Sequence, residues 1–180
     1  MSSVNESPNH FMVLDAISRG MKNAGKIAKA TRLDKATVDM VISDLAAQRL
    51  IVIVEKRGFF GGKQELQITE TGTRVLVAKK QELEKKFQQF QQWYSNGQMQ
   101  QLQNSMQMDR MWLPFMLFSG IMNAMFFMSM MSFMGAAMTP AESAAAGDAG
   151  ADVGADGAAD GGGDVGGDFG GDFGGGDFGF

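Results

Sequence analysis

Lysines and arginines recur through residues 22–63 of this 180-residue chain at positions that fit contacts to phosphate groups. Phosphate oxygens are bound chiefly by Lys and Arg, with Ser, Thr and backbone N–H groups in support. Beside Lys22, the candidates for such contacts are Lys26, Lys29, Arg32, Lys35, Thr37, Ser43, Lys56, Arg57 and Lys63. Residues 1–95 carry 15 Lys and Arg against 10 Asp and Glu, a net charge of +5, which points to nucleic acid as a partner.

Other kinds of chemistry find little support in the sequence. The chain has no cysteine, which excludes disulfides, cysteine nucleophiles and cysteine metal ligands. It has one histidine, His10, so no histidine cluster can bind zinc. His10 and Asp15 lie five residues apart, a pair too weak to indicate a catalytic dyad. We therefore expect no enzymatic activity, no cofactor and no metal site.

The hydrophobic pattern predicts the elements that would position these cations. Helical spacing predicts helices over residues 10–19, 24–30 and 34–49, with a turn at 31–33. In the third helix, one face carries Val38, Val41 or Ile42, and Leu45, and Asp34 stands at the N-cap. Alternating apolar residues predict strands over 51–56 and 64–69, joined by a tip with three glycines. These elements predict an α+β fold with a winged helix-turn-helix over residues 10–73.

A resemblance to a known family rests on a pattern within residues 10–75. Its positions are Ile27-Ala28, Leu33-Asp34, Thr37-Val38, Ile42, Leu45 and Leu50-Ile51, followed by Ile68-Thr69-Glu70-Thr71-Gly72. This pattern resembles the winged-helix domains of MarR-like and PadR-like transcriptional regulators and of their archaeal relatives. The resemblance implies a third helix in the major groove of double-stranded DNA and a wing along the adjacent backbone or minor groove.

The exposed face of the third helix departs from that family. Where MarR-like helices often carry Ser-Arg after the Thr-Val pair, this chain has Asp39-Met40. An aspartate faces phosphates unfavourably, although an acidic side chain can accept a hydrogen bond from cytosine. The sequence favours a DNA-binding transcriptional regulator. The alternative is a winged helix that serves as a protein-interaction adaptor, anchored at a membrane or to an apolar partner.

A long fourth helix is predicted over residues 74–95, which contain no Gly or Pro and are rich in Lys, Glu and Gln. Its narrow apolar seam consists of Leu76, Leu83, Phe87, Phe90 and Tyr94. Such a seam is typical of coiled coils, and the resemblance to PadR-like proteins implies a dimerising helix here, so we expect a homodimer. The alternative is a helix that packs back on its own domain.

Residues 111–138 form the most apolar stretch, 28 residues without a charge that contain nine of the 16 methionines. We expect one Met-rich helix here, after a Gln- and Met-rich connector over 96–110. Its length suffices for a transmembrane helix, which would leave the winged helix in the cytoplasm and the C-terminal segment on the far side. Pro114 and Asn123 argue against such a span. The alternatives are a Met-rich surface for apolar partners and a buried helix or hairpin in a dimer core.

The ends of the chain are poor in large apolar side chains. Residues 139–180 contain 15 glycines, eight aspartates and one glutamate but no Lys or Arg. Such a segment buries too little apolar surface to repay its ordering entropy, so we expect a disordered tail over 139–180. Residues 1–9 are polar, and we expect disorder there too. Two roles are considered for the tail: it keeps its apolar neighbour dispersed, or it competes with DNA for the basic face.

Overall fold

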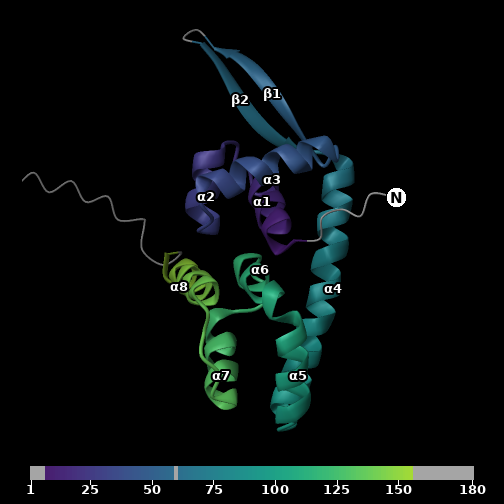
Figure 1. Cartoon of the computed structure of the whole chain (residues 1–180), viewed down its shortest axis with the longest axis vertical. Helices are drawn as coiled ribbons and strands as arrows, with labels where there is room; N and C mark the ends of the chain where they lie inside the picture. Colours follow the sequence, from purple (N-terminus) through teal and green to yellow (C-terminus); the bar gives the residue numbers. More distant parts are fainter. Residues whose placement is uncertain (1–6, 59–60, 156–180) are drawn as a thin grey trace, which may run out of the picture.

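The computed structural model describes residues 7–58 and 61–155, with the backbone alone described over 148–155. The protein is α+β, mostly helical, and arranged in two tiers (Figure 1). The first tier contains α1 (Pro8–Ser18), α2 (Ala24–Thr31), α3 (Lys35–Ala47), β1 (Ile51–Gly58) and β2 (Gly61–Ile68). The second contains α5 (Met99–Asp109), the short 3-10 helix η1 (Arg110–Trp112), α6 (Leu113–Phe118), α7 (Ala124–Met134) and α8 (Pro140–Ala155). The long helix α4 (Glu70–Ser95) runs alongside both tiers (Figure 1).

Helices α1 to α3 form where the hydrophobic pattern predicts them. Residues 10–17 of α1 are all buried, so α1 is the central helix of the first tier. α2 begins after Asn23, whose side chain accepts a hydrogen bond from the Lys26 N–H at 2.9 Å. α3 begins after the predicted N-cap Asp34, which accepts from the Thr37 N–H at 2.8 Å. Both helices pack against α1 and against each other, which is compatible with a helix-turn-helix.

The two strands form an antiparallel hairpin in which Ile51 lies opposite Ile68. The backbone N–H of Leu66 donates to the Lys22 carbonyl at 3.0 Å, so the segment between α1 and α2 is tied to β2. Three helices followed by this hairpin are compatible with the predicted winged helix. Residues 59–60, at the tip of the predicted wing, lie outside the described residues.

The predicted long helix is present as α4, which begins directly after β2. Its N-cap is Thr69, whose hydroxyl oxygen accepts from the Gly72 N–H at 3.0 Å. The same hydroxyl lies 2.8 Å from the Arg49 carbonyl, to which it donates. Gly72 lies so close to the base of the hairpin that an added Cβ would be 2.1 Å from the Leu50 carbonyl oxygen. The start of α4 is thus fixed against the base of β1.

The predicted single helix over 111–138 is wrong, and most of the predicted connector over 96–110 is helical. α5 occupies most of the connector, and the apolar stretch is divided into η1, α6 and α7. Pro114 stands in the first turn of α6, Gly120 has φ 78° in the turn that follows, and Asn123 caps α7. Each of these residues favours a helix boundary over a continuous helix. Among the described residues, no helix has both the length and the apolar character that a membrane crossing requires, which corrects the predicted transmembrane helix.

The predicted disorder of residues 139–180 is wrong for their first part, because α8 occupies residues 140–155. α8 starts with a capping box: the Glu142 carboxylate accepts from the Thr139 N–H at 2.6 Å, and the Glu142 N–H donates to Thr139 Oγ1 at 3.3 Å. At the other end of the chain, α1 already begins at Pro8, within the predicted disordered start. Residues 1–6 and 156–180, for which we also predict disorder, lie outside the described residues.

Aromatic contacts join the two tiers. The ring centroid of Phe11 in α1 lies 5.7 Å from that of Trp112 and 6.0 Å from that of Phe115. Farther along α4, the ring centroid of Tyr94 lies 5.4 Å from that of Phe126 in α7. The buried hydrophobic side chains of both tiers belong to one cluster, so the molecule has a continuous core.

Candidate nucleic-acid interface

The cationic surface, as we name it, consists of Lys26 and Lys29 on α2 and Lys35 at the start of α3. All three side chains are exposed, and they come from two helices that pack against each other. Within the part of the chain that the structure describes, none of the three forms an ion pair. Arg32, in the turn between the helices, is also exposed and has φ 58°. The structure therefore brings together the predicted cations of residues 26–35.

The two predicted hydroxyl contacts on α3 bond to the helix itself. The Thr37 hydroxyl donates to Asp34 Oδ2 at 2.5 Å, beside the capping bond from the Thr37 N–H. These bonds, the hydroxyl bond foremost, lower the pKa of the Asp34 carboxyl, so it remains charged next to Lys35. The Ser43 hydroxyl donates to the Asp39 carbonyl at 3.0 Å and stays exposed. Thr37 therefore stabilises the start of α3, and Ser43 alone of this pair lies on the exposed middle of the helix.

One cation of the hairpin, Lys56, forms an ion pair, and two others, Arg57 and Lys63, do not pair with any described residue. Lys56 Nζ lies 3.0 Å from Glu65 Oε2, and Lys22 Nζ lies 3.3 Å from the same oxygen. The hydrogen bond from Lys56 is the main cause of a lowered pKa of the Glu65 carboxyl, with Lys22 adding to it. Arg57 and Lys63 are exposed and form no ion pair within the described residues. The hairpin therefore presents Arg57 and Lys63, whereas Lys56 pairs with Glu65.

The exposed middle of α3 carries little that could read a base edge. Met40 is 57% exposed, and its neighbour Asp39 is exposed as well. Lys35 lies at the start of the helix and Arg49 beyond its end. The cations thus flank the middle of α3, an arrangement suited to phosphate contacts on either side.

The predicted dimerisation seam of α4 is occupied by contacts within the chain. Leu76, Leu83 and Phe90 are buried, and α4 packs against α1 and α5. Phe87 and Tyr94 are half-buried, and their ring centroids lie 5.2 and 5.4 Å from that of Phe126 in α7. These five side chains therefore contribute to the fold of one chain, as in the alternative in which the helix packs back.

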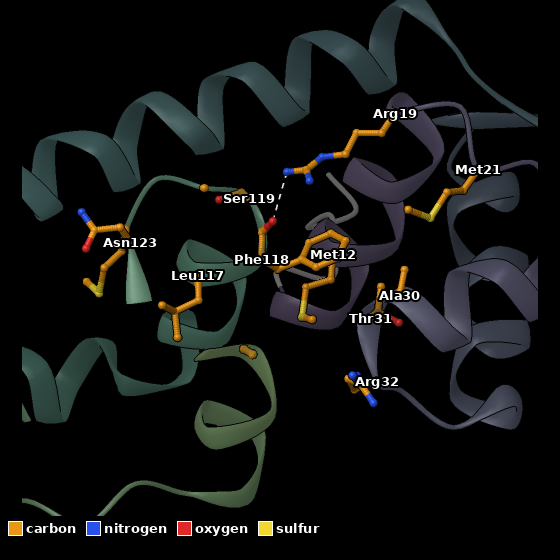
Figure 2. Close-up of a pocket in the computed structure, with 13 residues that line it drawn as sticks. Met12, Arg19, Met21, Ala30, Thr31, Arg32, Leu117, Phe118, Ser119 and Asn123 are labelled. Atoms are coloured by element: carbon orange, nitrogen blue, oxygen red, sulfur yellow. Dashed lines mark hydrogen bonds between the residues drawn. The ribbon is translucent and has the colours of Figure 1, made fainter. Parts of the chain in front are cut away.

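A cleft of about 480 Å³ separates α1 and α2 from the second tier (Figure 2). Its walls include Met12, Met21 and Phe118, and Figure 2 shows Arg19 reaching across it. Arg19 Nη2 donates to the Phe118 carbonyl at 3.1 Å, and its guanidinium lies 5.1 Å from the Phe118 ring centroid. A second cleft of about 760 Å³ also borders Met12, Arg32 and α8. Arg19 thus links the two tiers at the first of these clefts.

One ion pair that the sequence did not predict joins α8 to the rest of the second tier. Arg110 Nε lies 2.9 Å from Glu142 Oε1, and Arg110 Nη2 lies 3.0 Å from Oε2. Burial alone raises the pKa of the Glu142 carboxyl, but hydrogen bonds from Arg110 and Thr139 outweigh it and leave the pKa lowered. The same pair raises the pKa of Arg110. The run from Thr139 to Glu142 is a capping-box pattern that could have revealed the start of α8.

The residues considered for catalysis have separate partners. His10 is buried, and its Nε2 lies 3.2 Å from Asp44 Oδ2 on α3. Asp15 is buried between Arg19, at 2.8 Å, and Lys80, at 2.5 Å. Among the described residues, no three His, Asp or Glu side chains are grouped so that they could hold a metal ion.

The cations that flank α3 are therefore the feature of this chain that offers the clearest chemistry. Lys26, Lys29 and Lys35 are exposed and lie on two helices that pack against each other. Comparisons with protein-family models, with curated proteins and with solved structures find no match to this chain.

Proposed function

We propose that the first tier is a winged helix-turn-helix of the MarR-like or PadR-like kind that binds double-stranded DNA and regulates transcription. In this proposal α3 enters the major groove and the hairpin lies along the adjacent backbone. The observation that carries it is the set of exposed cations that form no ion pair with any described residue. These are Lys26, Lys29, Lys35, Arg57 and Lys63.

The balance of contacts favours binding through the DNA backbone. Five phosphate contacts would give a slope of log K against log salt of roughly −4 to −5. Asp39 and Met40 leave the middle of α3 without the Arg, Lys or Asn side chains that commonly recognise bases. We therefore propose weak sequence preference, with a Kd on the order of 10⁻⁴–10⁻⁶ M at physiological salt.

Fluorescence anisotropy of a mixed-sequence duplex with the full chain tests this proposal. Binding should weaken steeply between 50 and 200 mM salt, roughly 10²-fold or more for five contacts. The triple variant K26A/K29A/K35A should weaken binding at low salt and make the salt slope shallower by about 3. K85A is the matched control, because Lys85 is exposed on α4, away from α2 and α3. Absence of binding at 50 mM salt, or equal loss in the control, would refute the proposal.

A second candidate function is an adaptor that binds an apolar partner protein. Exposed methionines of the second tier favour it: Met125 is 80% exposed, Met108 77% and Met111 59%. Methionine-rich surfaces adapt to apolar partners. The same side chains are also the face left for a homodimer, since the α4 seam is covered. An adaptor predicts that M125S or M108S impairs function in cells while K26A/K29A/K35A does not, and the DNA-binding proposal predicts the reverse.

A further inference from the structure

The C-terminal segment and the cationic surface carry opposite charges. Residues 156–180 contain six aspartates and no Lys or Arg, and their structure lies outside the described residues. The cationic surface exposes Lys26, Lys29 and Lys35, and none of them forms an ion pair with another described residue. Opposite net charges on two parts of one chain attract each other over roughly a Debye length, about 10 Å at 0.1 M salt.

Helix α8, which precedes this segment, borders the turn between α2 and α3. Ala144 and Ala145 of α8 line a cleft together with Thr31 and Arg32, so α8 faces the turn between α2 and α3. Figure 1 shows α8 next to the end of α2. The last residue of α8, Ala155, follows Gly147 by about 12 Å of helix. Residues 156–180 therefore follow a helix whose first half borders the turn that links α2 to α3.

The length and spacing of the segment fit that surface. Twenty-five residues can span at most about 80–90 Å, so the segment is long enough to reach from the second tier to α2 and α3. The aspartates recur every four or five residues: Asp156, Asp160, Asp164, Asp168, Asp172 and Asp177. Several equivalent groups of two or three aspartates can therefore meet three lysines, and the site does not depend on a single register.

We infer that residues 156–180 dock on the cationic surface of their own chain and compete there with DNA phosphates. The docking itself needs only the charges described above, whereas the competition rests on the proposed function. A tethered segment that reaches its site has an effective concentration on the order of 1 mM. If its intrinsic Kd is on the order of 0.1 mM, as for weak non-specific phosphate binding, it lowers the affinity for DNA roughly tenfold.

Carbodiimide cross-linking of the full chain, without DNA, tests the docking. The reagent joins a lysine amine to a carboxylate only when the two are in direct contact. We expect monomeric products that link Lys26, Lys29 or Lys35 to aspartates of residues 156–180, and their loss at 1 M salt. Lys85 is the internal control. Links spread equally to Lys85, links found only in dimeric products, or no links to the cationic surface would overturn the inference.

Two full-length variants test the competition. One replaces all six aspartates of residues 156–180 by Asn, and the other replaces them by Glu, which keeps the charge. The Asn variant should bind DNA about tenfold more tightly at low salt than the original chain, and the Glu variant should bind like the original. Equal affinities of all three would overturn the competition. Cross-links to Lys26, Lys29 or Lys35 without any DNA binding would refute the proposed function and leave the docking intact.

Discussion

Glu142 joins three parts of the second tier through one buried carboxylate. Its oxygens accept from Arg110 at 2.9 and 3.0 Å and from the Thr139 N–H at 2.6 Å. Arg110 also donates to the Ala137 carbonyl at 2.6 Å. The pair thus links η1, the segment before α8 and α8 itself. An ion pair on an exposed surface contributes only modestly to the free energy of unfolding, but the Glu142 carboxylate is buried.

Replacing Glu142 by Gln should therefore lower stability in a pH-dependent way. At pH 7 we expect a loss of about 1–3 kcal/mol in the free energy of unfolding, since a charged hydrogen-bonding group is removed. The pKa of Glu142 is lowered from 4.5 in the fold, so its contribution is complete above that value and is lost as the pH falls through the folded pKa. Urea titrations at pH 7 and pH 3 should show the difference between variant and original chain shrinking on acidification.

E84Q is the matched control for this experiment, because Glu84 is exposed on α4 and has no ion pair within the described residues. It should change stability by no more than about 0.5 kcal/mol at either pH. A constant difference between E142Q and the original chain across this pH range would contradict the account of Glu142.

Local bonds at the residue scale were predictable, and distant pairs were not. The N-cap at Asp34 follows from its position before α3, because its partner Thr37 is three residues away. Lys56 is one of the predicted phosphate contacts, and no local pattern shows that its ammonium group pairs with Glu65 on the facing strand. His10 pairs with Asp44, 34 residues away, and such a contact depends on the packing of α1 against α3.

At the element scale, Thr69 and Gly72 determine how the hairpin meets α4. Thr69 caps the helix and bonds back to the end of the α3–β1 connection, while Gly72 allows the two backbones to approach closely. The run from Ile68 to Gly72 was part of the resemblance to winged-helix domains. In this chain a glycine is required at position 72 because any side chain there would collide with the Leu50 carbonyl.

Gly72→Ala should be strongly destabilising. The new Cβ would lie 2.1 Å from the Leu50 carbonyl oxygen, a backbone atom, so α4 or the hairpin must shift. We expect a loss of about 3 kcal/mol in the free energy of unfolding, measured by urea denaturation. Gly147→Ala in α8 is the control: its Cβ meets nothing within 4 Å, and alanine in a helix should add about 0.5–1 kcal/mol. Equal effects of the two substitutions would contradict this explanation.

The apolar stretch shows why helix boundaries were harder to predict than helices. Its lack of charge fits both a membrane helix and short buried helices, and length alone favoured one continuous helix. Pro114 and Asn123 were visible in the sequence as obstacles to a span, and the structure places them at the starts of α6 and α7. Nothing local shows that α6 packs on α1, because that contact joins residues about 100 positions apart.

On the scale of the whole molecule, the two tiers share one core. Phe11 of α1 contacts Trp112 and Phe115, and Lys79 Nζ of α4 lies 4.8 Å from the Trp112 ring centroid. The seam of α4 that suggested a dimer closes this core instead. The spacing of the apolar residues in α4 does not show which surface covers them, because a narrow apolar stripe can pack against a partner chain or against its own chain.

A shared core predicts cooperative unfolding of the described helices. Trp112 lies between the tiers, and Trp93 lies near the end of α4, 6.2 Å from the Phe90 ring centroid. In guanidinium titrations, tryptophan fluorescence and far-UV circular dichroism should give the same midpoint. W93F and W112F, each compared with its own dichroism curve, separate the two reporters. Distinct midpoints for the two tryptophans would contradict a single cooperative transition.

Helix α4 also connects the hairpin to the far end of the molecule. Its 26 residues make it about 39 Å long. Gly72, in its first turn, has no clearance against the Leu50 carbonyl, so the root of the hairpin cannot shift independently of the start of α4. The axis of α4 therefore determines where the hairpin stands relative to α5 and α7, which lie at the opposite end of the molecule (Figure 1).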